Sequence, residues 1–278
     1  MQYIRVESVP AALDAIHDSK AHVIAGGTDL LVKMRGGLIR PEILIDISDI
    51  ADLRGINASD TFIEIGAATP QAEIRMNPVV CERLPLLAEV LGALGSPQIR
   101  NRGTLGGNLV NASPAADSAI PLLLYDAQVL VLSPSGERET PLSQFFAGPG
   151  RTTLSPGELV KAIRIPLLEG DWSSFFHKVG KRRALTISIA SVGALLQIEN
   201  AQIVEARLAA GSVAPTPLRL TELEGELRGV RLDEQTIEEA VRKGSSAVSP
   251  ISDVRASAEY RSQVVGELIG RALREAIT

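Results

Sequence analysis

Apolar residues follow two spacings along the chain, and the pattern changes near residue 168. Before that point, short apolar runs that are typical of strands alternate with segments of helical spacing. The predicted strands are 22–25, 43–47, 62–66, 127–133 and 159–166, and the predicted helices are 11–16, 28–35, 69–76, 84–94 and 119–125. After it, apolar runs predict three successive strands, at 172–178, 188–198 and 203–210, and charged helices follow from 218 to 277. The chain is therefore expected to be an α+β protein, with a second, smaller unit beside the first.

Three local features refine this expectation. Thr69 begins the predicted helix 69–76 and is expected to cap it. Residues 98–111 are polar and rich in glycine, and a connection of this length inside a compact domain is more often functional than idle. Residues 199–201 are expected to form the hairpin turn between the last two strands.

Composition excludes several classes of function. The 278 residues include one cysteine, Cys81, which cannot form an intramolecular disulfide, a Cys-ligated zinc site or a Cys-bound iron–sulfur cluster. We expect this thiol to be buried. A net charge of −5 and 3% aromatic residues argue against nucleic-acid binding. The chain shows no secretory signal pattern and no apolar run long enough to insert into a membrane, so we expect a cytoplasmic protein.

The first candidate site is a pair of glycines between a predicted strand and a predicted helix. Gly26 and Gly27 follow the strand, and Thr28 and Asp29 open the helix. Glycines allow close approach of a ligand, and free amides at a helix start favour phosphate. The segment matches neither a Walker loop nor the GxGxxG fingerprint. By itself it also fits a plain tight turn.

A second glycine pair lies in the polar connection. Gly106 and Gly107 follow the hydroxyl residue Thr104 and precede Asn108, whose amide can both donate and accept. Asp117 follows shortly, at the start of an apolar helix. It fits either a helix-capping charge or a hydrogen bond to a ligand. Two such segments in one domain can hold an extended, doubly phosphorylated ligand from two sides.

Four segments together resemble one protein family. VIAGGTDLL, SPQIRNRGTLGGNLVNASPAAD, ELVKAIRIP and FFHKVGKRRALTISIASVGA are similar, in this order, to the FAD-binding (medium) subunits of molybdenum hydroxylases of the xanthine dehydrogenase and aerobic carbon monoxide dehydrogenase type. The resemblance covers nearly the whole chain. It implies a two-part FAD domain of the vanillyl-alcohol-oxidase (PCMH) type at 1–168. It also implies a C-terminal domain at 169–278, with a three-stranded antiparallel sheet and helices.

The resemblance implies a set of cofactor-binding residues. The first glycine segment would hold the FAD pyrophosphate, the second would also contact the cofactor, and Asp117 would bind it. Leu94 and Val160 would make apolar or backbone contacts, and Lys178 would lie near the flavin unless it is a surface strand lysine. The implied set is Ile24, Ala25, Gly26, Gly27, Thr28, Asp29, Leu30, Leu94, Thr104, Gly106, Gly107, Asn108, Asp117, Val160 and Lys178.

The resemblance also implies partners. A large subunit would carry the molybdenum cofactor and a small subunit two [2Fe–2S] clusters, in a dimer of heterotrimers. Electrons would pass through FAD to NAD or to another acceptor, such as a quinone. The cationic loop 180–184 either attracts NAD phosphates or is a solvated turn. Two alternatives stay open: a stand-alone flavin reductase or oxidase of the same fold, and an assembly protein that binds no flavin.

Overall fold

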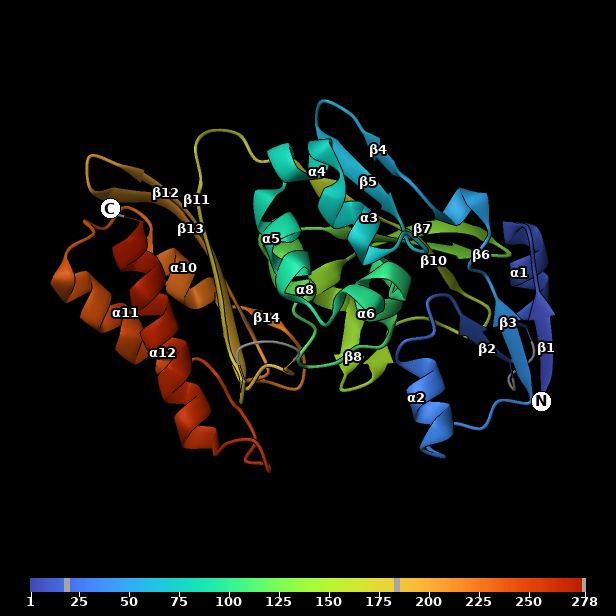
Figure 1. The fold of residues 1–278 in the computed structure, drawn as a ribbon. Helices are drawn as coiled ribbons and strands as arrows, with labels where there is room; N and C mark the ends of the chain where they lie inside the picture. Colours follow the sequence, from blue (N-terminus) through green and yellow to red (C-terminus); the bar gives the residue numbers. More distant parts are fainter. Residues whose placement is uncertain (18–20, 183–185, 277–278) are drawn as a thin grey trace.

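The computed structural model describes residues 1–17, 21–182 and 186–276 (Figure 1). The N-terminal unit is a parallel three-stranded sheet of order β1-β3-β2 with two helices. Its elements are β1 (Gln2–Arg5), α1 (Val9–Ala15), β2 (Ala21–Ile24), α2 (Leu30–Arg35) and β3 (Ile43–Asp46). Parallel pairing requires crossover connections, and α1 and α2 lie in those connections.

An antiparallel five-stranded sheet follows, with order β4-β5-β10-β6-β7. Its strands are β4 (Ile56–Ala58), β5 (Phe62–Gly66), β6 (Gln128–Ser133), β7 (Gly136–Pro141) and β10 (Leu159–Pro166), and η1 (Ala51–Leu53) precedes it. A small hairpin of β8 (Phe146–Gly148) and β9 (Arg151–Thr152) lies beside it. The central strand β10 is buried along most of its length, because it pairs with β5 on one side and β6 on the other.

Seven short helices form a layer next to this sheet, and three predictions about this layer are wrong. They are α3 (Gln71–Met76), α4 (Pro78–Arg83), α5 (Pro85–Ala93), α6 (Pro97–Arg102), α7 (Leu105–Val110), α8 (Ala119–Leu124) and α9 (Leu142–Phe145). The expected polar connection 98–111 is mostly helical, because Ser96 caps α6 and Thr104 caps α7. Thr69 does not cap α3: its buried hydroxyl bonds the backbone of Gly55, and Pro70 is the N-cap. The Cys81 thiol is exposed, not buried.

The C-terminal unit confirms the three predicted strands and adds a short fourth. Its antiparallel sheet has the order β11-β12-β13-β14 and carries three helices. The elements are β11 (Ser173–Val179), β12 (Ala190–Glu199), β13 (Gln202–Gly211), β14 (Leu218–Arg219), α10 (Thr221–Leu227), α11 (Glu234–Ser246) and α12 (Ala258–Glu275). The turn between β12 and β13 is where expected, with Asn200 and Ala201 both at positive φ.

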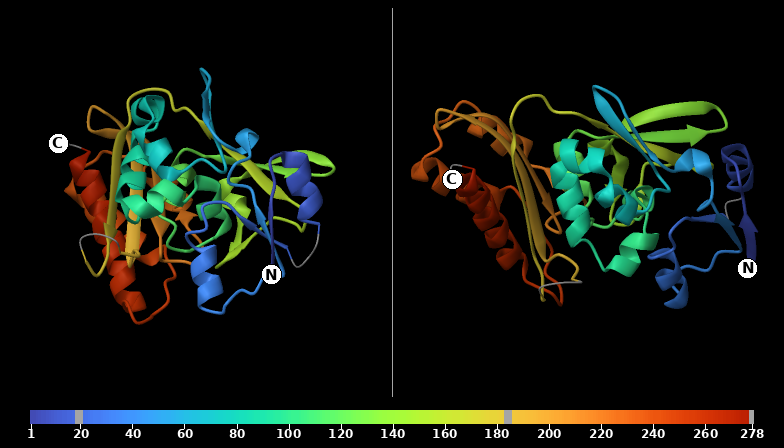
Figure 2. Two further views of the ribbon diagram at one scale, coloured as in Figure 1. Left: turned by 45° about the vertical axis from the view of Figure 1, so that its right-hand side comes forward. Right: turned by 45° about the horizontal axis from the view of Figure 1, so that its top comes forward.

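Both faces of the C-terminal sheet are covered. Helices α10 to α12 lie on one face and the layer of short helices on the other, as both views of Figure 2 show. Alternate residues of β12 therefore enter different cores: Leu195 packs with the short helices, while Ala194 and Leu196 pack with α12 and its neighbours. Burial on two faces explains why this strand is a nearly continuous apolar run. Among the described helices, none is long and apolar enough to cross a membrane.

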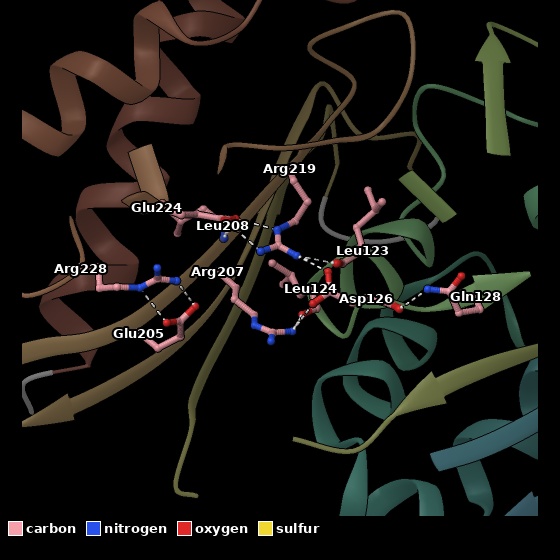
Figure 3. Close-up of polar contacts among 10 residues, drawn as sticks. All are labelled: Leu123, Leu124, Asp126, Gln128, Glu205, Arg207, Leu208, Arg219, Glu224 and Arg228. Carbon is pink, nitrogen blue, oxygen red and sulfur yellow. Dashed lines mark hydrogen bonds and ion pairs between the residues drawn. The ribbon is translucent and has the colours of Figure 1, made fainter. Parts of the chain in front are cut away.

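Two arginines of the C-terminal sheet hold the end of α8 (Figure 3). Arg207 donates to the carbonyl of Leu124 at 2.7 Å, and Arg219 donates to that of Leu123 at 2.9 Å. Both also pair with Asp126, each at 2.8 Å. Cations at a helix C-terminus satisfy carbonyls that have no partner within the helix. The C-terminal unit therefore fixes α8 from outside the helix layer.

Candidate functional site

A cavity of about 870 Å³ lies where the N-terminal unit meets the short helices. Two segments, already singled out by their glycines, form much of its wall. We call residues 24–30, between β2 and α2, the first glycine segment, and residues 104–108, at the start of α7, the second glycine segment. The end of α5 and the start of β10 complete it, with the residues just before α8.

The first glycine segment packs so closely against the end of α6, just before the second glycine segment, that a side chain would not fit between them. A Cβ atom on Gly26 would lie 1.9 Å from the carbonyl oxygen of Arg102. Gly27 has φ of 72°, a conformation that residues with a Cβ rarely adopt. These positions require glycine for the wall itself, before any ligand is considered.

The backbone amides of the two segments differ in their availability. In the second, the amides of Leu105, Gly106 and Asn108 bond carbonyls of the chain, and the Gly107 amide bonds the Thr104 hydroxyl. Within the described residues, no acceptor takes the amides of the first segment's glycine pair, 26–27. The first segment can therefore donate to an anion, while the second contributes shape and the Asn108 side chain.

Asp117 joins the cavity to the C-terminal unit. Its side chain is buried, at 7% exposure for the residue. It accepts hydrogen bonds from Lys178 Nζ at 2.7 Å and from Ser188 Oγ at 2.6 Å. Lys178 Nζ also donates to the carbonyl of Ala93 at 2.9 Å, at the end of α5. A buried pair of opposite charges is tolerated because each partner has further hydrogen bonds.

Of the residues implied by the resemblance, all except Lys178 line the cavity. Lys178 lies behind Asp117, so its charge reaches the cavity wall through that ion pair. Of the cationic loop 180–184, Arg183 and Ala184 lie outside the described residues.

Several residues that line the cavity were not predicted from the sequence. The most polar are His22, Lys33, Gln71, Asn111 and Glu158. Asn111 accepts a hydrogen bond from Lys33 and donates to Asp29 at 3.3 Å, which links the two glycine regions. Glu158 also lines the cavity, and its hydrogen bond from Arg138 lowers the pKa of its carboxyl. No local motif marks these positions, because the tertiary fold brings them together.

The cavity suits an elongated ligand with an anionic part and apolar parts. Its volume is in the range of small-molecule sites, and amide donors, a hydroxyl and apolar walls such as Leu94 and Val160 line it. Two buried polar atoms at its wall, His22 Nδ1 and Gln71 Oε1, have no hydrogen-bond partner in the described structure. In the described parts of the chain, no three His, Cys, Asp or Glu side chains come together as metal ligands.

Comparison with known families and proteins identifies the ligand class. Residues 1–168 match the FAD binding domain in molybdopterin dehydrogenase, and residues 175–276 match the CO dehydrogenase flavoprotein C-terminal domain. The putative xanthine dehydrogenase FAD-binding subunit XdhB of Escherichia coli is 34% identical over 99% of this chain and 95% of its own length. The carbon monoxide dehydrogenase medium chain of Hydrogenophaga pseudoflava is 32% identical over 93% of this chain and 90% of its own length.

Solved structures show the same fold. A chain of the Cu,Mo-CO dehydrogenase superposes with a TM-score of 0.95 at 31% identity, over 99% of this chain and 97% of that chain. A chain of quinoline 2-oxidoreductase from Pseudomonas putida 86 gives a TM-score of 0.94 at 26% identity, over 99% of this chain and 96% of that chain. The glycine-walled cavity and these full-length matches agree, and the chain belongs to the family of FAD-binding oxidoreductase subunits of the xanthine dehydrogenase and carbon monoxide dehydrogenase type.

Proposed function

We propose that this chain is the electron-transferring flavoprotein subunit of a molybdenum hydroxylase. Bound FAD would relay electrons from [2Fe–2S] clusters on a small partner subunit to NAD or another acceptor, such as a quinone. A large partner subunit would carry the molybdenum cofactor and the substrate site. The complete enzyme would be a dimer of heterotrimers.

The observation that carries this proposal is a cofactor-sized cavity in a chain that cannot hold the clusters itself. A [2Fe–2S] cluster of the common type takes four cysteine thiolates, and this sequence holds Cys81 as its one cysteine. The clusters of the proposed enzyme would therefore come from another chain. The relatives support the same division, since two of them are named as a medium chain and as an FAD-binding subunit.

The residues at the cavity fit FAD in three ways. The free amides of Gly26 and Gly27 would donate to the pyrophosphate, because backbone amides in a turn bind anions. Leu94 and Val160 would offer apolar contacts. Asp117 would offer a carboxylate oxygen to a hydroxyl or an N–H of the cofactor, and Lys178 and Ser188 would hold that carboxylate in place.

The experiment is a spectroscopic titration of the complex. The chain is co-expressed with its large and small subunits, and the purified complex is reduced anaerobically in steps. We expect one FAD per chain, whose visible band bleaches together with reduction of the clusters. NADH should bleach the same band if NAD is the acceptor; otherwise a soluble quinone should restore the band in the reduced complex.

Two results would contradict the proposal. One is a complex with intact clusters and molybdenum in which this chain holds no FAD. The other is a flavin band that does not respond when the clusters are reduced. Turnover of a substrate by the isolated chain with NAD(P)H, without partners, would instead favour a stand-alone flavin reductase.

A further inference from the structure

Gln71 places an unpaired polar atom at the wall of the cavity. The residue begins α3 and is 2% exposed. Its Oε1 atom has no hydrogen-bond partner in the described structure, although the residue lines the cavity. A buried carbonyl oxygen without a hydrogen-bond donor destabilises the chain when no ligand is bound. A ligand that donates to this oxygen would remove that penalty.

The backbone fixes Gln71 at the meeting point of the two glycine regions. Its amide donates to the carbonyl of Gly103 at 2.9 Å, and Pro70 forms a β-bridge with Thr104. A Cβ atom on Gly103 would lie 3.3 Å from Thr28 Oγ1 and 3.7 Å from Gln71 Oε1. Gln71 therefore stands close to the first glycine segment, where the pyrophosphate is expected to bind.

The unpaired atoms elsewhere show that this position is unusual. Besides His22 and Gln71, the described structure has three unpaired buried side-chain atoms, on Ser191, Ser212 and Arg261. None of those three residues lines the cavity. The two at the cavity are thus the ones that a ligand can satisfy. Gln71 is the more deeply buried of the two, so its oxygen has less access to water.

We propose that Gln71 is a specificity-determining residue for the dinucleotide, whose Oε1 accepts a hydrogen bond from a sugar hydroxyl next to the pyrophosphate. This inference rests on the FAD site of the proposed function. The pyrophosphate has no hydrogen to donate at neutral pH, so the donor must come from a neighbouring unit. Hydroxyls flank the pyrophosphate on both sides, on the ribityl chain and on the ribose. Inorganic pyrophosphate carries no sugar hydroxyl.

The test compares Gln71→Met with Gln128→Met in the full-length chain. Met keeps the length of the side chain and removes its hydrogen bonds. Gln128 lies on β6, does not line the cavity, and serves as the matched control. FAD dissociation constants come from quenching of flavin fluorescence, and melting temperatures are measured for the empty chains. Inorganic pyrophosphate and ADP serve as competing probes.

We expect Gln71→Met to weaken FAD binding at least tenfold and to leave the melting temperature of the empty chain unchanged or higher. Pyrophosphate affinity should not change. ADP has the ribose but no ribityl chain, so a matching loss for ADP assigns the hydroxyl to the ribose, and an unchanged ADP affinity assigns it to the ribityl chain.

An unchanged FAD dissociation constant would overturn the inference. So would a loss of pyrophosphate affinity, or a fall in the empty chain's melting temperature that accompanies weaker FAD binding, because a purely structural role predicts that fall. The proposed function fails on a different result, namely a flavin band that does not respond when the clusters of the complex are reduced.

Discussion

Replacing Arg219 by methionine should destabilise the chain strongly, because it leaves a buried carboxylate without its counterion. Arg219 is 14% exposed and Glu224 8% exposed by their side chains. They form a bidentate pair with distances of 2.6 and 2.7 Å, and Arg219 also reaches Leu123 and Asp126 (Figure 3). Removing one partner of such a buried pair costs about 3–5 kcal/mol. At roughly 2–4 °C per kcal/mol for a domain of about this size, the melting temperature should fall by roughly 6–20 °C.

A second substitution tests whether the uncompensated charge is the cause. Glu224→Gln in the Arg219→Met background removes that charge. It keeps a side-chain oxygen that can accept a hydrogen bond from the Leu208 amide, which bonds Glu224 Oε1 at 2.7 Å in the unmodified chain. The double variant should therefore regain most of the loss, with about 1–2 kcal/mol remaining for hydrogen bonds that are not restored. Urea unfolding followed by circular dichroism gives the free energies of unfolding for the full double-mutant cycle.

An exposed pair in the same region provides the control. Arg228 and Glu205 also form a bidentate pair, but Arg228 is largely exposed, so Arg228→Met should leave the melting temperature nearly unchanged. The reasoning would be refuted if Arg219→Met cost no more than this control, or if the double variant were less stable than Arg219→Met.

Two further predictions concern the cavity. Gly26→Ala should abolish FAD retention, because its Cβ would lie 1.9 Å from the Arg102 carbonyl oxygen. Gly225→Ala is the control and should leave the flavin content unchanged, because a Cβ at this helical position meets open space. Equal flavin spectra of the two purified variants would contradict this prediction. Arg138 lowers the pKa of Glu158 in the folded chain below its ordinary 4.5. The ionised Glu158 therefore stabilises the fold above about pH 4.5, and this stabilisation is lost as the pH falls through the lowered pKa of the folded chain. Glu158→Gln should flatten the fall in melting temperature in that acid range, and an unchanged pH profile would refute it.

Local patterns in the sequence predicted more of the fold than of the cavity. The strands β11 to β13 and their hairpin turn followed from apolar runs and a turn near Asn200, since both signals act over a few residues. Helices α6 and α7 were missed because α6 (PQIRNR) is mostly polar and α7 (LGGNLV) contains a glycine pair, so neither shows an apolar helical spacing, although Ser96 and Thr104 cap them.

Among the cavity residues too, only those with a local sequence signal could be predicted. The glycine pairs were found because close backbone approach requires glycine wherever it occurs. Gln71, His22 and Glu158 were not found, because only the packing of distant segments makes them neighbours. The Asp117–Lys178 pair joins residues 61 positions apart, and no local spacing could predict that the two charges neutralise each other.

The two-sided burial of the C-terminal sheet has a consequence for synthesis on the ribosome. Helix α8 packs its Ile120 against Gly193 of β12 and Gly211 of β13, where a Cβ atom would lie 2.5 and 3.2 Å from that side chain. The end of β13 follows the end of α8 by 87 positions, from 124 to 211. At a translation rate of roughly 5–20 residues per second, the apolar face of α8 stays uncovered for roughly 4–17 s until β13 has been synthesised. An exposed apolar surface is prone to aggregation, so the rate of translation sets how long the nascent chain is at risk.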